Sequence, residues 1–191
     1  MKTVAEHCRA NVLVTPQALF AMEDVTTLHH HGDSVVFVKQ LDADLLDIEF
    51  YSNSNCLIYI VSGQETITTS DGESYNLLPG SLCLLPQGET LHSDYARTAG
   101  SLKAYLVFFG DAVVAEYLKS RRKFAHAKIG PKRLFQMQSS AVISAFFSSL
   151  QAMHQQNISS SALLTLKLLE LLNLLAAEGK EGILDAQLAK V

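Results

Sequence analysis

The chain has 191 residues, 48% of them hydrophobic, and a formal net charge of −4 at pH 7. This length suits one domain, or a domain with an appended subdomain, and the apolar content is sufficient for a buried core. The acidic balance gives no reason to expect that the whole chain binds nucleic acid or an anionic membrane.

The sequence also argues against a secreted or membrane-spanning protein. The N-terminus lacks the continuous apolar segment of a secretory signal, and the apolar stretch Leu163–Ala177 is short and interrupted by charged residues. The cysteines Cys8, Cys56 and Cys83 include no C-x-x-C pair, so neither a zinc knuckle nor a disulfide framework is predicted. We expect a soluble, cytoplasmic protein whose buried thiols stay reduced.

The first 28 residues give weak signals, with one short strand predicted at Asn11–Val14 before Pro16. Strands are predicted at Val35–Val38 and Leu45–Tyr51, and a polar turn at Ser52–Asn55. From residue 58 to residue 109, short apolar runs alternate with turn signals, which are Ser62-Gly63, Asp71-Gly72, Pro79-Gly80, Gln87-Gly88 and Gly100. This pattern predicts closely spaced antiparallel strands.

The C-terminal third has helical periodicity. Asp111 is a plausible N-cap for a short helix, and Ser139 or Ser140 for a second. A third helix follows Ser159–Ser161 and ends at Gly179, so that the second and third helices form a hairpin. The predicted helices are Ala112–Arg122, Ser139 or Ser140 to Gln155, Ala162–Glu178, and a last stretch at Gly182–Val191.

The spacing of Gly80, Pro86, Gly88 and His92 resembles the second signature of the cupin barrel, with one residue added before the histidine. The order of this signature and the following "YLVFF" strand resembles the N-terminal regulatory domain of AraC/XylS-type transcription regulators. The resemblance implies an α+β fold, in which a cupin-like antiparallel β-barrel (a double-stranded β-helix or jelly roll) precedes an α-helical hairpin. It also implies an effector-binding barrel over residues 1–110 and a helical dimerisation subdomain over residues 111–191. In that family a helix-turn-helix domain follows, which this chain lacks, and DNA would be contacted only through that domain.

The predicted helix at Ala162–Glu178 is apolar on more than one face, since nine of the thirteen residues from 163 to 175 are leucine. One neighbouring helix covers only one such stripe. A helix fully buried in one large core is one interpretation, and a homodimer interface is the one we favour. The predicted interface leucines are Leu164, Leu168, Leu171, Leu172 and Leu175.

Four residues are candidates for lining an effector pocket: Tyr59, His92, Tyr95 and Tyr105. Each has a polar tip and lies on or beside a predicted strand, and ligand pockets rely on a few such groups. Alternation along a strand places Tyr59 with Val61, and Tyr105 with Val107, without indicating which face is interior. Packing in the core is the alternative for each tyrosine, and a rim position satisfied by backbone or water is the alternative for His92.

We predict neither a metal nor another cofactor, and no catalytic residues. The string His29-His30-His31-Gly32-Asp33 is interpreted as a solvated polar loop, because adjacent side chains on an extended segment point to opposite sides. Metal-binding cupins use an H-x-H pair and a glutamate in a first motif, which is missing here, so His92 would be alone.

Seven basic residues and no acidic ones lie between Lys119 and Arg133. We interpret this run as a solvated connector, with a contact to phosphates or to an acidic partner as the alternative. The leading hypothesis for the whole chain is the ligand-sensing and dimerisation module of a transcription regulator, not an enzyme. A small metal-dependent cupin enzyme (a dioxygenase or isomerase) and a barrel that binds a regulatory protein are the alternatives.

Overall fold

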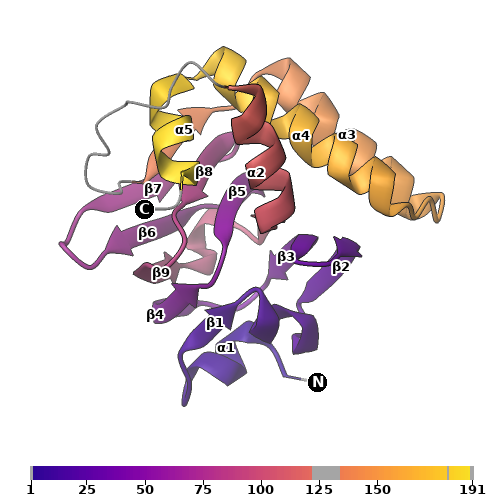
Figure 1. Cartoon of the computed structure of the whole chain (residues 1–191). Coiled ribbons are helices and arrows are strands. Elements are labelled where there is room, and N and C mark those ends of the chain that lie inside the picture. Colours follow the sequence, from indigo (N-terminus) through magenta and orange to yellow (C-terminus); the bar gives the residue numbers. More distant parts are fainter. Residues whose placement is uncertain (1, 122–133, 180, 190–191) are drawn as a thin grey trace.

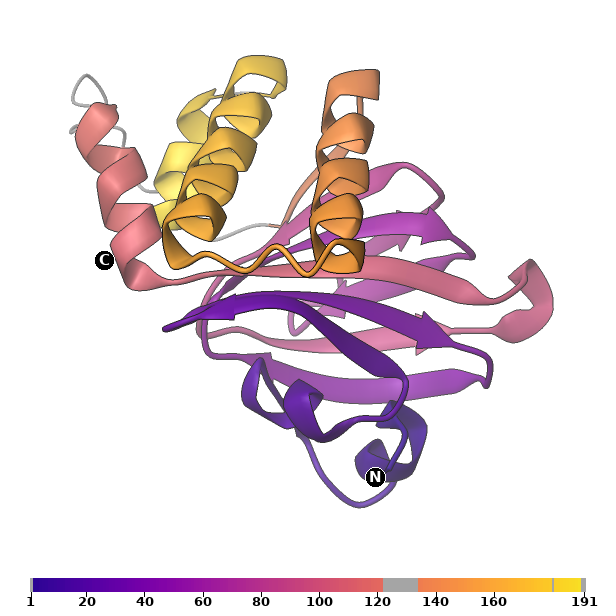
Figure 2. The same cartoon turned by 90° about the vertical axis from the view of Figure 1, so that its right-hand side faces the viewer.

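The computed structural model describes residues 2–121, 134–179 and 181–189 (Figure 1). Two β-sheets pack face to face, and a layer of helices covers the outer face of one of them (Figure 2). The N-terminal elements are α1 (Val4–Cys8), β1 (Leu13–Thr15), the 3-10 helix η1 (Gln17–Ala21), β2 (Val25–His31) and β3 (Ser34–Leu41). The central elements are β4 (Leu45–Ser52), β5 (Asn55–Ser62), β6 (Glu65–Thr69), β7 (Ser74–Leu77), β8 (Ser81–Leu85), β9 (Thr90–Tyr95), the 3-10 helix η2 (Arg97–Ala99) and β10 (Leu102–Phe109). The C-terminal elements are α2 (Asp111–Ser120), β11 (Phe135–Gln138), α3 (Ala141–Gln155), α4 (Ser161–Glu178) and α5 (Glu181–Leu188).

The strand order is β1-β4-β9-β6-β7 in one sheet and β11-β8-β5-β10-β3-β2 in the other. All pairs are antiparallel except β1 with β4, which is parallel. Strands of this order, closed into two facing sheets, form a jelly-roll barrel. The predicted fold class, a cupin-like antiparallel barrel followed by helices, is confirmed.

The burial of the strands follows from which faces are covered. In the six-stranded sheet, β3, β5, β8 and β10 read as nearly continuous apolar runs, and both of their faces are buried. One face lines the barrel interior and the other lies under the helices (Figure 2). In the five-stranded sheet, β9 alternates buried and partly exposed residues, because its outer face meets solvent.

The predicted turns are present between the strands. The glycine of each turn signal has a positive φ, from 76° to 89°, which residues with a Cβ rarely adopt. Gly63 is also sterically required, because a Cβ there would lie 2.8 Å from Leu102 Cα. Turn chemistry in the sequence therefore identified the strand boundaries correctly.

The helices begin close to their predicted starts. The hydroxyl of Ser140 accepts a hydrogen bond from the Ile143 N–H, and that of Ser160 accepts one from the Leu163 N–H, so both serines are N-caps. The prediction of Asp111 as an N-cap is wrong, since β10 runs directly into α2 and Gly110 holds the cap position. Gly179 follows α4 in an extended conformation, not in the left-handed one that a C′ glycine adopts.

The helical layer is built onto the barrel. β11, which lies beyond residue 110, pairs with β8, and α3 and α4 share one hydrophobic cluster with the outer face of the six-stranded sheet. The division of the chain at residue 110 stays a prediction. Within the described residues, no helix is long and apolar enough to cross a membrane.

Candidate functional site

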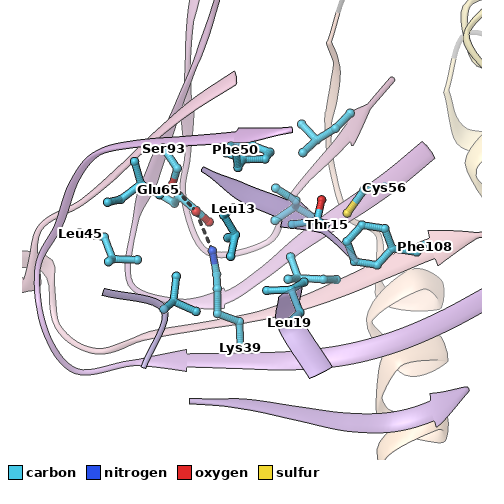
Figure 3. A pocket seen from close by; sticks show the side chains of 15 residues that line it. Leu13, Thr15, Leu19, Lys39, Leu45, Phe50, Cys56, Glu65, Ser93 and Phe108 are labelled. Atoms are coloured by element: carbon cyan, nitrogen blue, oxygen red, sulfur yellow. Dashed lines mark hydrogen bonds and ion pairs between the residues drawn. The ribbon is translucent and has the colours of Figure 1, made fainter. Parts of the chain in front are cut away.

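A small cavity lies inside the barrel, between the two sheets (Figure 3). Its free volume is about 50 Å³, enough for a few water molecules. Most of the wall is apolar, and it comes from both sheets and from the N-terminal segment. The lining residues are Val4, Leu13, Thr15, Leu19, Lys39, Leu45, Ile48, Phe50, Cys56, Ile58, Glu65, Leu85, Ser93, Leu106 and Phe108.

One end of this cavity carries a buried polar cluster, formed by Lys39 on β3, Glu65 on β6 and Ser93 on β9. Lys39 Nζ donates to Glu65 Oε1 at 2.6 Å, and the Ser93 hydroxyl donates to the same oxygen at 2.6 Å. Lys39 is 7% exposed and Glu65 is 1% exposed. Figure 3 shows the three side chains meeting among apolar neighbours.

The second carboxylate oxygen of Glu65 has no partner. Glu65 Oε2 is buried and accepts no hydrogen bond from any group in the part of the chain that the structure describes. A buried polar atom without a partner carries a desolvation penalty of about 1–3 kcal/mol, or more for a charged group. A molecule in the cavity that donates a hydrogen bond to this oxygen would remove that penalty.

The N-terminal segment closes the cavity on the side away from the helices (Figure 2). It contributes Val4 from α1, Leu13 and Thr15 from β1, and Leu19 from η1. The carboxylate of Asp24 holds this segment in place by accepting from the Val4 N–H at 3.0 and 3.1 Å. Burial raises the pKa of this carboxyl group above its ordinary value.

The cysteines of the barrel are free thiols without nucleophilic character. Cys56 lines the cavity, and Cys83 is buried on the adjacent strand. Burial raises the pKa of the Cys83 thiol to about 12 and raises that of Cys56 further. Both are thus protonated at neutral pH, and the cavity has no thiolate to offer a substrate.

The structure does not bring the four predicted lining residues together at this cavity. Tyr59 and Tyr105 point to the outer face of the six-stranded sheet, where the ring of Phe147 on α3 stacks on Tyr59 with centroids 4.4 Å apart. The Tyr59 hydroxyl shares a hydrogen bond of 3.2 Å with Ser144, also on α3. The two tyrosines therefore join the sheet to the helical layer.

Tyr95 and His92, both on β9, lie apart from each other and from the two other tyrosines. The Tyr95 hydroxyl lies 2.8 Å from the Gly100 carbonyl oxygen and accepts the Leu102 N–H at 3.1 Å, so it fixes the connection between β9 and β10. His92 faces outward on β9, and its Nδ1 lies 3.0 Å from an Asp47 carboxylate oxygen. Tyr95 thus has the core position that was its alternative, whereas His92 contacts the side chain of Asp47 and not the backbone or water of its stated alternative.

The histidine string is not a loop, and this prediction is corrected. His29, His30 and His31 end strand β2, which pairs with β3. His29 is buried because α3 covers it, and its Nε2 lies 3.1 Å from the Leu150 carbonyl oxygen. No group of three or more histidine, cysteine, aspartate or glutamate side chains able to hold a metal ion occurs among the described residues.

Of the basic run, residues 122–133 lie outside the described part of the chain. The two basic residues that precede them have acidic neighbours on the helices. Lys119 donates to Glu116 at 3.2 Å, and Arg121 Nε lies 3.7 Å from an Asp185 carboxylate oxygen.

The five predicted interface leucines lie inside the chain's own core. The residues Leu164, Leu168, Leu171, Leu172 and Leu175 are between 0% and 3% exposed. Helix α4 is covered on several sides at once, because it packs against α2, α3, α5 and β2. The interpretation of these five leucines as surplus apolar surface needs correction, since all five are core. Leu169 is partly buried, and Leu166, at 63%, is the large apolar residue of α4 that stays exposed.

Sequence reasoning missed the polar cluster of the cavity. Lys39 is a lone charge in the apolar strand of residues 34–41, and a charge so placed is rare unless it is paired. This signal identifies Lys39 as unusual without identifying Glu65, because the partner lies 26 residues further along and meets Lys39 only across the barrel.

Comparison with known proteins identifies a family to which this chain is similar. Residues 55–185, more than two thirds of the chain, match the family model described as the ExsA N-terminal regulatory domain. Among curated proteins, none matches the chain.

Two solved structures of ToxT from Vibrio cholerae are similar to this chain. ToxT of strain O395, bound to (E)-4-(8-methylnaphthalen-1-yl)but-3-enoic acid, has a TM-score of 0.61 at 12% identity, covering 83% of this chain and 61% of that one. ToxT of strain SCE256, bound to an unsaturated fatty acid, has a TM-score of 0.55 at 11% identity, covering 78% of this chain and 57% of that one. The chain thus spans less than two thirds of the ToxT chains, and at these identities the likeness is one of fold.

Proposed function

This chain belongs to the family of ExsA N-terminal regulatory domains, which are part of AraC-type transcription regulators, and from that premise we propose that its barrel senses a small amphiphilic effector. The observation that carries the proposal is the interior cavity, which is apolar except for the Lys39–Glu65–Ser93 cluster at one end. Pockets of this composition hold an apolar body and orient it by a few polar contacts. The acids bound to ToxT combine an apolar body with one polar group in the same way.

The six-stranded sheet connects the cavity to the helices, so that a structural change at the cavity can reach them. On β10, Leu106 and Phe108 line the cavity, whereas Val107 and Phe109 belong to the cluster under the helices. Helix α2 begins directly after this strand. Because the cavity is small, an effector larger than a few water molecules has to displace side chains that line it. In a close-packed core, such displacements shift the neighbouring side chains and backbone as well.

We further propose that this module acts in the cytoplasm within a dimeric regulator whose DNA contacts lie outside it. Dimer formation is supported by apolar side chains exposed on the α3–α4 hairpin, namely Val142 at 56%, Ile158 at 46% and Leu166 at 63%. Figure 1 shows this hairpin projecting beyond the sheet, where a second copy can reach it. A regulatory protein seated on the same hairpin is the second candidate, and a heteromeric complex without any effector would favour it.

Thermal denaturation of the chain tests the sensing proposal. The midpoint Tm is measured with and without amphiphiles of about six carbon atoms, such as 1-hexanol and hexanoate. A ligand at 100 times its Kd stabilises the folded state by about 2.7 kcal/mol and raises Tm. The variant Cys56→Leu puts a larger side chain into the cavity and should abolish the shift, whereas the surface variant Leu46→Ala should keep it. No shift with any probe, or an equal shift in Cys56→Leu, would overturn the proposal.

A further inference from the structure

The buried polar cluster restricts the chemistry of the effector. Lys39 and Glu65 carry opposite charges and pair with each other inside the barrel, so the cavity is electrically neutral before anything binds. Among the described residues that line the cavity, Glu65 Oε2 is the buried side-chain atom without a hydrogen-bond partner. We propose that the effector is a neutral molecule with an O–H donor that binds Glu65 Oε2, and not a carboxylate anion; this inference rests on the proposed sensing function.

An anion is disfavoured by charge. The Lys39 ammonium group is already paired with Glu65 Oε1, and it also interacts electrostatically with the carboxyl group of Asp24. A second carboxylate would therefore enter an apolar cavity as an uncompensated negative charge, which is costly at low dielectric. An ammonium ligand would leave an uncompensated positive charge beside Lys39 in the same way.

A hydroxyl group meets the requirement without adding charge. It donates to Glu65 Oε2, and its own oxygen accepts one of the ammonium hydrogens of Lys39 that Glu65 does not take. Hydrogen bonds to charged groups are stronger than neutral ones, so an isosteric ligand that lacks the donor should bind roughly 10- to 100-fold more weakly. A water molecule held between Lys39 and Glu65 can make the same contacts, and the hydroxyl of the ligand would take its place.

The decisive comparison uses the unmodified chain and four probes of matched length at pH 7: 1-hexanol, 1-methoxypentane, hexanoate and hexylammonium. Binding is measured by calorimetric titration and by the shift in Tm. We expect 1-hexanol to bind roughly 10- to 100-fold more tightly than the ether, and both ions to bind more weakly than the alcohol. Equal or tighter binding of hexanoate or of the ether would overturn the inference and leave the sensing function standing, whereas failure of all four probes would contradict the sensing function itself.

Two variants check that Glu65 causes the selectivity. Glu65→Gln removes the negative charge and leaves Lys39 without a counter-ion, so hexanoate should now bind more tightly than 1-hexanol. The double variant Lys39→Met with Glu65→Leu has no polar pair, so the alcohol and the ether should bind equally. Circular dichroism verifies that each variant is folded, and the comparison on the unmodified chain stands if one is not. A folded Glu65→Gln variant that keeps the original order of the probes would contradict the assignment.

Discussion

Single leucine substitutions in α4 test whether this helix belongs to the core of the chain or to an interface with a partner. Leu168 is fully buried between the sheet side and the neighbouring helices, whereas Leu166, two positions earlier, is 63% exposed. Truncating a buried leucine to alanine costs about 2–5 kcal/mol, because transfer free energy is lost and a cavity remains. We expect about 3 kcal/mol for Leu168→Ala and less than about 0.5 kcal/mol for Leu166→Ala.

Urea denaturation followed by circular dichroism measures this difference. With a slope of about 2 kcal/mol per molar urea, a loss of 3 kcal/mol lowers the midpoint by about 1.5 M. The midpoint of Leu166→Ala should stay close to that of the unmodified chain. Equal midpoints for the two variants would refute the placement of Leu168 in the core.

The corresponding glutamate variants distinguish folding from assembly. Leu168→Glu buries a charge without a partner and should unfold the chain. Leu166→Glu should stay folded and, if the exposed face of the α3–α4 hairpin forms the dimer, should sediment as a monomer. A folded, monomeric Leu168→Glu variant would instead support the interface that the leucine pattern alone predicted.

Two further predictions concern single groups in the barrel. Tyr95→Phe should lower the free energy of unfolding by about 1–3 kcal/mol, because buried backbone groups lose their partner, and an unchanged urea midpoint would contradict the role assigned to the hydroxyl. The thiols of Cys8 and Cys56 should resist iodoacetamide at pH 8, since burial raises the pKa of Cys8 to about 11 and that of Cys56 further and keeps both protonated. Mass spectrometry should show alkylation of Cys8 increasing as the pH approaches 11 and of all thiols in guanidinium, and rapid native labelling of Cys56 at pH 8 would show that the cavity is open.

Local chemistry explains what the sequence predicted well. The positive φ at Gly63, Gly72 and Gly88 belongs to single turns, and the serine caps of α3 and α4 act within three residues. Such features depend on neighbours along the chain, so they can be read before the fold is known. Most of the barrel signature is of the same kind, because Gly80, Pro86 and Gly88 lie between strands at fixed spacing.

The faces of the strands could not be assigned in this way. Alternation correctly grouped Tyr105 with Val107, but both faces of that strand are apolar, and the pattern does not distinguish the barrel interior from the surface under the helices. The leucine-rich helix presents the same ambiguity, since a stripe that fits a partner chain also fits α2 or α3. In both cases the missing information is which element covers which face, and this is set by long-range packing.

The six-stranded sheet lies between the cavity and the helices, and this position explains how an effector in the barrel would act on the helices. In the five-stranded sheet, the outer face of β9 meets solvent and not a layer of helices. The six-stranded sheet is packed on both faces, and successive residues of β10 alternate between the cavity and the helical cluster. An outward displacement of Phe108 would shift the backbone that carries Val107 and Phe109, and these two side chains share one hydrophobic cluster with residues of α2 and α3. The ion pair joins Lys39 on the six-stranded sheet to Glu65 on the five-stranded sheet, so an effector bound to this pair would contact both sheets.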